Sequence, residues 1–226
     1  MQPTSRMTNG DGKKPCHDAD ILAKTLAMIR AQEKVCMFID NSNLFHALKS
    51  MELGNRRLDY IKLRDLLADG RSISVRFYYS TPPTITEDDR RKQEKRSKFY
   101  DFLECNLGYQ MIELPLRERQ VIEGGQVQYL PVEKGLDCEI VYDMAILSRS
   151  GHYDTFLLVT GDEDYARTVR RIRRDTGLQI EVAFFAGSGC STVLTKEASK
   201  FIDLNQLKDE IFREYRKDAF QELAAV

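Results

Sequence analysis

The sequence predicts an α/β fold in which a mainly parallel sheet is flanked by helices. From residue 35 to about residue 200, short apolar runs of the buried-strand type alternate with segments of helical periodicity. The chain has 226 residues, of which 42% are hydrophobic, and this is enough to bury one good-sized core. One domain with tails is therefore the simplest organisation.

The segment before the first strand is expected to form a tail and one helix. Residues 1–17 combine Gly, Pro, Thr, Asn, Asp and Lys, a composition typical of a disordered tail. Residues 18–33 follow a helical period, with one apolar face made of Ile21, Leu22, Leu26 and Ile29. We therefore place the domain at residues 18–205, with its core at about 35–205.

Five apolar runs predict the strands of the sheet, and helical patterns separate them. The strands are expected at residues 35–40, 73–80, 109–114, 155–160 and 179–185. The helices are expected at residues 43–51, 60–69, 86–106, 136–147, 163–176 and 192–200. Gly108 marks the end of the long third helix, because glycine is the residue that most often ends a helix.

Two segments depart from this alternation. In residues 117–134, apolar residues stand on both sides of Gly124-Gly125, which predicts a small β-hairpin insertion. Residues 206–226 carry apolar side chains at helical spacing, which predicts a C-terminal helix. That helix either packs on the domain or binds a partner, which would be another protein or, in a homodimer, a second copy.

Composition and charge exclude several classes of protein. The formal net charge of −1 argues against a protein coated in positive charge, although a local basic patch is still compatible with it. The five cysteines are scattered, without a C-x-x-C pair, which is typical of reduced thiols and not of a zinc site or a disulfide framework. No apolar stretch could span a bilayer and no secretory signal is evident. We therefore expect a cytoplasmic protein without a membrane partner.

Four aspartates stand where a predicted strand ends or a predicted helix begins: Asp40, Asp137, Asp162 and Asp164. In an open α/β sheet the carboxyl ends of the strands gather at one edge, where ligands bind. We therefore expect these carboxylates to meet. A cluster of carboxylates repels itself unless cations neutralise it, and hard oxygen ligands favour Mg²⁺ or Mn²⁺. The pattern indicates a metal site.

The polar tetrad Asp40-Asn-Ser-Asn43 directly follows the first strand. These oxygen-bearing side chains are expected at the carboxyl edge of the sheet, beside the acids, and we expect Asn41 and Asn43 to contact the substrate. The alternative is a plain strand-to-helix turn in which Asn41 or Ser42 caps the helix. The tetrad alone does not separate these two interpretations.

The second acidic segment is Thr160-Gly-Asp-Glu-Asp-Tyr165. Helix capping explains one acid at such a place comfortably and three acids less well. Glu163 lies between the two aspartates and is expected to point elsewhere. Asp137 lies on the inward face of its helix, which is awkward for a purely structural acid. Asp143 lies well away from it around the helix and is expected to be structural or to support a metal ligand, and not to bind the metal itself.

Three motifs of the chain resemble those of NYN domains, which are PIN-like nucleases. The motifs are Phe-Ile-Asp40-Asn-Ser-Asn43, Lys134-Gly-Leu-Asp137 followed by Tyr-Asp143-Met, and Leu-Val-Thr-Gly-Asp162-Glu-Asp164-Tyr. The resemblance covers about residues 35–205 and is closest to the bacterial LabA-like branch. It implies a PIN-like Rossmannoid three-layer sandwich, a Mg²⁺ or Mn²⁺ site and ribonuclease chemistry.

The resemblance also implies roles for individual residues. The metal-facing acids of the family, which are also its catalytic residues, fall at Asp40, Asp137, Asp162 and Asp164 of this chain. Asn43 falls near them. The chain departs mildly from the usual pattern, with Thr160 for a serine, Glu163 for a small polar residue and Tyr165 for a phenylalanine. None of these departures removes a carboxylate.

An RNA substrate needs positive charge near the acids. Residues 90–98, in the first half of the long helix, hold six basic residues and one acid. We expect substrate contacts from Arg90, Arg91 and Lys95 on this helix and from Thr160 and Lys134 nearer the acids. The alternative is that residues 90–98 are a solvated helical face and that Lys134 is an ordinary exposed residue.

The sequence thus predicts a metal-dependent endoribonuclease. One or two divalent ions held by the aspartates would orient a phosphodiester, lower the pKa of a bound water and stabilise the leaving oxygen. One alternative is a non-catalytic RNA-binding or regulatory module that acts through protein partners. Another is a phosphatase of the haloacid-dehalogenase type, which generally wants a second acid two residues after the first, where this chain has Ser42.

Overall fold

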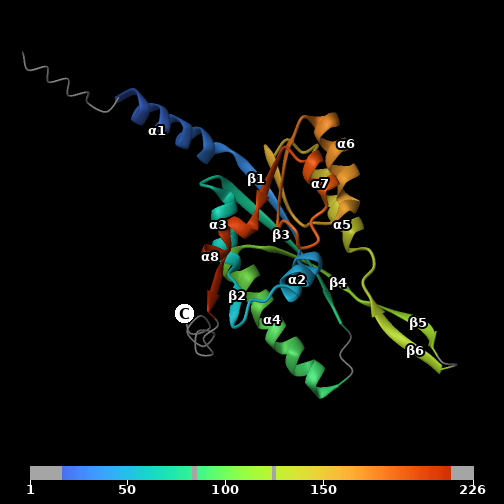
Figure 1. Cartoon of the computed structure of the whole chain (residues 1–226). Coiled ribbons are helices and arrows are strands. Elements are labelled where there is room, and N and C mark those ends of the chain that lie inside the picture. Colours follow the sequence, from blue (N-terminus) through green and yellow to red (C-terminus); the bar gives the residue numbers. More distant parts are fainter. Residues whose placement is uncertain (1–16, 83–85, 124–125, 215–226) are drawn as a thin grey trace, which may run out of the picture.

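The computed structural model describes residues 17–82, 86–123 and 126–214, which form a three-layer α/β sandwich (Figure 1). Its middle layer is a six-stranded sheet of order β4-β3-β1-β7-β8-β9, and every pairing in it is parallel. The strands are β1 Lys34–Asp40, β3 Ser72–Thr81, β4 Gln110–Pro115, β7 Thr155–Val159, β8 Gln179–Phe184 and β9 Lys200–Asp203. The predicted α/β fold with a mainly parallel sheet is confirmed.

Helices cover both faces of the sheet, because its central strands are apolar on both sides. Along β1, Val35, Met37 and Ile39 pack into one layer, and Cys36 and Phe38 pack into the other. The first layer holds α2 Asn41–Ser50, α3 Tyr60–Ala68, α4 Glu87–Leu107 and α8 Lys208–Ile211. The second layer holds α5 Leu136–Leu147, α6 Ala166–Thr176 and α7 Thr192–Glu197.

Two elements extend from this body (Figure 1). One is the antiparallel hairpin of β5 Arg117–Glu123 and β6 Gln126–Val132, which confirms the predicted insertion, although its residues 124–125 lie outside the described part. The other is α1 His17–Gln32, whose four predicted apolar residues are each more than half exposed. Of the predicted tail, residues 1–16 lie outside the described residues. Among the helices that are described, none is long and apolar enough to cross a membrane.

Residues 198–214 differ from the prediction. The helix expected at 192–200 ends at Glu197, and β9 then joins the edge of the sheet. The helix expected at 206–226 is represented by the turn η2 Leu204–Leu207 and the short α8, after which β10 Phe212–Glu214 pairs with β2 Arg56–Leu58. Phe212 is buried 6.1 Å from the ring of Phe185, which favours the extended chain there. Residues 215–226 lie outside the described part.

The amino ends of the strands are joined by Arg71, whose side chain is only 6% exposed. Its guanidinium contacts Glu181 on β8 at 2.9 Å and Glu33, just before β1, at 3.2 Å. Glu33 also accepts the hydroxyl of Thr155 at the start of β7 (2.6 Å). These charges are paired and hydrogen-bonded, as buried charges must be. This edge of the sheet is therefore a structural one, and the candidate site lies at the opposite edge.

Candidate active site

Asp40 lies at the centre of the carboxyl edge of the sheet. It ends β1, which has β3 on one side and β7 on the other, and it is only 2% exposed. Its Oδ1 accepts the backbone N–H of Asn43 at 3.0 Å, so that Asp40 itself caps α2, and not Asn41 or Ser42. Its Oδ2 accepts the hydroxyl of Thr160 at 3.2 Å. The fully buried Thr160 directly follows β7, so its side chain holds Asp40 in place.

Asp137 is joined to Asp40 through a tyrosine. Asp137 stands in the first turn of α5, which begins after Gly135 with a left-handed backbone (φ 98°) and has no side-chain cap. The hydroxyl of Tyr165 lies 2.7 Å from Asp137 Oδ1 and 3.2 Å from Asp40 Oδ2. Two of the predicted acids, 97 positions apart in the sequence, therefore share one hydrogen-bonding partner.

Asp164 lies in the short helix η1 Glu163–Tyr165, and Asp162 stands just before this helix. Asp162 caps this helix, since its Oδ1 accepts the backbone N–H of Asp164 at 3.0 Å. Asp162 is half-buried and Asp164 is exposed. Although Asp137 is exposed as a residue, loss of water around its carboxylate raises its pKa, and the charges of Asp162, Glu133 and Asp164 raise it further. All four predicted aspartates therefore belong to one electrostatic cluster.

The charge of Asp40 is costly in this position. Burial raises the pKa of Asp40 from 3.8 to about 6, and the negative charges of Asp137 and Glu133 add to the increase. The hydrogen bonds from Asn43 and Thr160 act in the opposite direction and lower it. A raised pKa with a named cause, at the carboxyl edge of a sheet, is typical of a functional site.

Glu133 is a fifth acid at the site, and it is not one of the acids predicted from the sequence. It follows β6 and accepts a hydrogen bond from the Ser42 hydroxyl on α2. Its charge raises the pKa of both Asp40 and Asp137. The signal that could have found it is its position directly before the Lys134-Gly-Leu-Asp137 motif. Glu133 ties the base of the hairpin to the site.

The two asparagines predicted to contact substrate make bonds within the protein. Asn43 Oδ1 accepts the backbone N–H of Gly161 at 2.9 Å, and Asn41 Oδ1 accepts the hydroxyl of Tyr60 at 2.9 Å. Gly161 is buried and has no room for a side chain, because an added Cβ would lie 2.5 Å from Phe184 Cδ1. Asn43 therefore fastens the end of β1 to the loop after β7, and substrate contact by either asparagine stays a prediction.

Two other acids close in sequence to the aspartates point elsewhere. Glu163 accepts the hydroxyl of Ser191 at 2.9 Å, as expected for an acid that does not face the site. Asp143 accepts the hydroxyl of Tyr78 at 2.6 Å and pairs with Arg76 at 2.7 Å. Both acids have structural partners, which makes them useful as controls for the four aspartates.

The predicted RNA-binding charges are exposed. Arg91 and Lys95 are exposed on α4, and Lys134 is exposed beside Glu133. Arg90 is exposed too and pairs with Glu87 one turn earlier at 3.5 Å. The first half of α4 and the hairpin both project from the side of the molecule where β3 and β4 end (Figure 1). The basic residues therefore have access to solvent on the side of the sheet that carries the acids.

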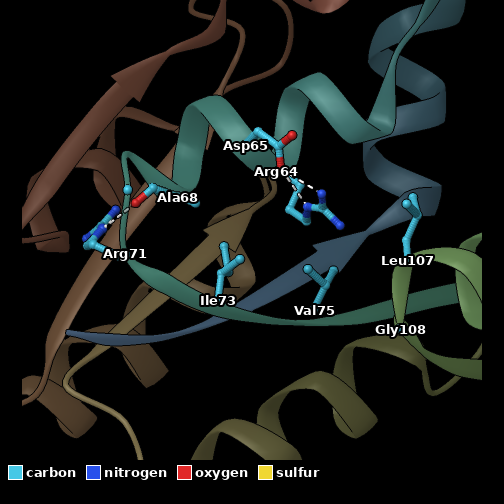
Figure 2. Close-up of a pocket in the computed structure, with 9 residues that line it drawn as sticks. Arg64, Asp65, Ala68, Arg71, Ile73, Val75, Leu107 and Gly108 are labelled. Carbon is cyan, nitrogen blue, oxygen red and sulfur yellow. Dashed lines mark hydrogen bonds and ion pairs between the residues drawn. The ribbon is translucent and has the colours of Figure 1, made fainter. Parts of the chain in front are cut away.

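A pocket of about 390 Å³ lies elsewhere, between α3, the start of β3 and the end of α4. Figure 2 shows Arg64, Asp65, Arg71 and Leu107 around it. Asp40 pairs in register with Tyr78, near the other end of β3, so this pocket lies towards the amino ends of the strands. It does not belong to the aspartate cluster.

The aspartate cluster has the chemistry of a site for a divalent cation. Carboxylate oxygens are the ligands that Mg²⁺ and Mn²⁺ prefer, and the mutual repulsion that raises the pKa of Asp40 and Asp137 is what a cation would relieve. As the side chains stand, no three His, Cys, Asp or Glu among the described residues are grouped closely enough to hold a metal. An ion bound here would require the carboxylate of Asp164 to turn towards Asp40 and Asp137, and Asp164 is exposed and has room to do so.

Comparisons with known proteins agree with this fold. A crystal structure of a protein of unknown function from Vibrio parahaemolyticus RIMD 2210633 is similar, with a TM-score of 0.55 and 18% identity over 77% of this chain and 94% of that one. At this identity the similarity supports the fold alone. No curated protein matches the chain.

The family is identified by its sequence model. The model of the NYN domain matches residues 34–205, which is more than half of the chain and includes all four aspartates. The match does not distinguish branches of the family, so the LabA-like branch stays a prediction. NYN domains are PIN-like and are generally nucleases. The chain belongs to the NYN domain family.

Proposed function

We propose that this protein is a metal-dependent endoribonuclease that hydrolyses phosphodiester bonds of RNA. The family supports nuclease chemistry in general terms. The observation that carries the proposal is the cluster of acids around Asp40, which is 2% exposed and whose pKa is raised to about 6. Burying a carboxylate among other carboxylates is unfavourable for stability alone, and a cation offsets it.

The buried and the exposed aspartates would have different roles. Asp40 is anchored by Asn43 and Thr160 and fixes the position of the site. Asp137 and Asp164 are exposed and can reach the substrate side. A Mg²⁺ or Mn²⁺ ion held by these carboxylates would supply a water of lowered pKa and stabilise the leaving oxygen. The acids themselves would position that ion relative to the phosphodiester.

RNA would be held by the basic half of α4. Arg91 and Lys95 are exposed there, with Lys134 closer to the acids. Such contacts are electrostatic, so RNA affinity should fall steeply with salt. Charge reversal to Glu at Arg91 and Lys95 should weaken binding and reduce the salt dependence without affecting metal binding.

The decisive experiment uses labelled single-stranded RNA with the purified full chain in Mn²⁺ or in EDTA. Asp40→Asn and Asp162→Asn should abolish cleavage. Glu163→Gln is the matched control, because it neutralises an acid in the same loop whose carboxylate bonds to Ser191. Cleavage that needs Mn²⁺, is lost in both Asn variants and is kept in Glu163→Gln supports the proposal.

Other outcomes would favour the alternatives. RNA binding without cleavage in Mn²⁺ would favour a regulatory RNA-binding module that acts through protein partners. Hydrolysis of a small phosphomonoester, with an aspartyl-phosphate trapped at Asp40, would favour a phosphatase. Cleavage that survives in Asp40→Asn would assign the nuclease activity to a contaminant.

A further inference from the structure

Tyr165 occupies an unusual position for a buried aromatic residue. It is fully buried in the core cluster that also contains Leu136 and Leu194, yet its hydroxyl meets two acids of the candidate site. The oxygen lies 2.7 Å from Asp137 Oδ1 and 3.2 Å from Asp40 Oδ2. Tyr165 ends η1, whereas Asp40 ends β1 and Asp137 lies in the first turn of α5. One phenol therefore joins three segments of the chain.

We propose that Tyr165 is a positioning residue, which keeps the carboxylate of Asp137 beside that of Asp40 so that both can reach one divalent cation. This inference rests on the proposed metal site. Two neighbouring carboxylates repel each other. The Tyr165 hydroxyl has one proton, which it donates to the nearer Asp137 Oδ1 or shares with Asp40 Oδ2, and this proton between the two acids opposes their repulsion before any ion arrives. A ligand carboxylate that is itself hydrogen-bonded is oriented by its partner, which is how outer residues tune metal affinity.

The rigid side chain of Tyr165 suits this role. Because its ring is fully buried, the hydroxyl is fixed relative to the sheet and to the buried Asp40, and the exposed Asp137 aligns to it. The bond engages only Oδ1 of Asp137. Within the described part of the chain, Oδ2 of Asp137 accepts no hydrogen bond and so stays available to an ion. A phenylalanine would fill the same space in the core but would leave the two acids unconnected.

The chain offers a matched control for the hydroxyl. Tyr78 is also fully buried in the same core cluster, and its hydroxyl donates to the carboxylate of Asp143 at 2.6 Å. Asp143 pairs with Arg76 and takes no part in the aspartate cluster. Tyr165→Phe and Tyr78→Phe therefore delete the same chemical group from the same layer, and only the first deletion touches the site.

The test measures Mn²⁺ binding to the full chain by calorimetry, without RNA. We expect Tyr165→Phe to weaken Mn²⁺ binding by about 10–100-fold, the usual effect of removing an outer partner of a metal ligand. Tyr78→Phe should leave the Mn²⁺ affinity within about twofold of the wild type. Urea unfolding in EDTA verifies that both variants fold. Unchanged or tighter Mn²⁺ binding in Tyr165→Phe, or an equal loss in Tyr78→Phe, would overturn the inference.

A second readout separates positioning from general loss of structure. If the protein cleaves RNA, the Mn²⁺ concentration for half-maximal rate should rise in Tyr165→Phe, while the rate at saturating Mn²⁺ returns close to that of the wild type. A rate that stays low at saturating Mn²⁺ would mean that the hydroxyl does not act through metal binding. If no RNA is cleaved, the calorimetric comparison still decides the role of Tyr165, whereas the proposed nuclease function fails.

Discussion

Replacing Asp40 with asparagine should make the metal-free protein more stable while removing its proposed activity. Asparagine has the same shape as aspartate and can still accept the backbone N–H of Asn43, so the cap of α2 is kept. Its amide can donate to the oxygens of Thr160 and Tyr165, where the carboxylate accepted. What the substitution removes is a negative charge at a site that is 2% exposed.

The magnitude follows from the pKa of Asp40. A rise from 3.8 to about 6 means that the folded protein binds this proton more tightly than the unfolded chain does. The stability contributed by this group is therefore complete below about pH 4 and is lost as the pH rises past about 6. The loss is about 3 kcal/mol, at about 1.4 kcal/mol for each tenfold change in proton affinity. It corresponds to roughly 6–12 °C in melting temperature for a chain of this size.

Urea unfolding in EDTA, at about pH 7.5 and about pH 5, tests this reasoning. Asp40→Asn should exceed the wild type by about 3 kcal/mol at the higher pH and by roughly half of that at the lower pH. Glu163→Gln should show no such gain. Excess Mn²⁺ should stabilise the wild type and not Asp40→Asn. A variant no more stable than the wild type at the higher pH, or a gain that does not change with pH, would refute the argument.

Three further substitutions have expected outcomes. Gly161→Ala should lower the unfolding free energy by roughly 1–3 kcal/mol, because the new Cβ would lie 2.5 Å from a carbon of Phe184. Urea unfolding that is unchanged by this substitution would show instead that the loop can shift. Arg71→Met should lower the unfolding free energy by about 3–5 kcal/mol, because it leaves the buried Glu181 unpaired. Adding Glu181→Gln should recover much of this stability, and a double variant as unstable as Arg71→Met would contradict the account. Asp143→Asn should lower stability by about 1–3 kcal/mol yet keep Mn²⁺ affinity within about twofold by calorimetry, and a larger loss of affinity would place Asp143 in the metal site.

The sequence predicted those parts of the fold whose signal is local. β1, β3, β7 and β8 are apolar runs, so hydrophobicity alone located them. β9 was missed because it has only four residues, of which three are half-buried, and it follows a short helix without a break in polarity. The segment 212–214 was predicted as helix because Leu207, Ile211 and Tyr215 recur at helical spacing in the sequence. The burial of Phe212 beside Phe185 and the pairing of β10 with β2 decide its structure, and both depend on distant residues.

Part of the candidate site was likewise predictable from local sequence signals, and part of it was not. The grouping of the four aspartates was predictable because strand ends can be located in the sequence and parallel strands bring those ends together, whereas their role in metal binding stays a prediction. The contacts of Tyr165 were not predictable, since an aromatic residue at the start of a helix looks like core, and only packing shows where its hydroxyl points. Glu133 was missed for a related reason. It approaches the site through the placement of the hairpin base, which periodicity does not encode.

The central position of β1 has a consequence for folding during synthesis. β1 pairs with β3, which follows it closely in the sequence, and also with β7, which follows much later. The backbone N–H of Lys34 in β1 donates a hydrogen bond to the side chain of Asp154, just before β7, and these residues are 120 positions apart. Until β7 has been made, one edge of β1 has no strand to pair with, and residues 35–39 of that strand carry no charge. Such an edge invites pairing with other chains. Expression yield should therefore depend on how quickly residues 155–159 follow the first half of the domain, and slowed translation before β7 should increase aggregation.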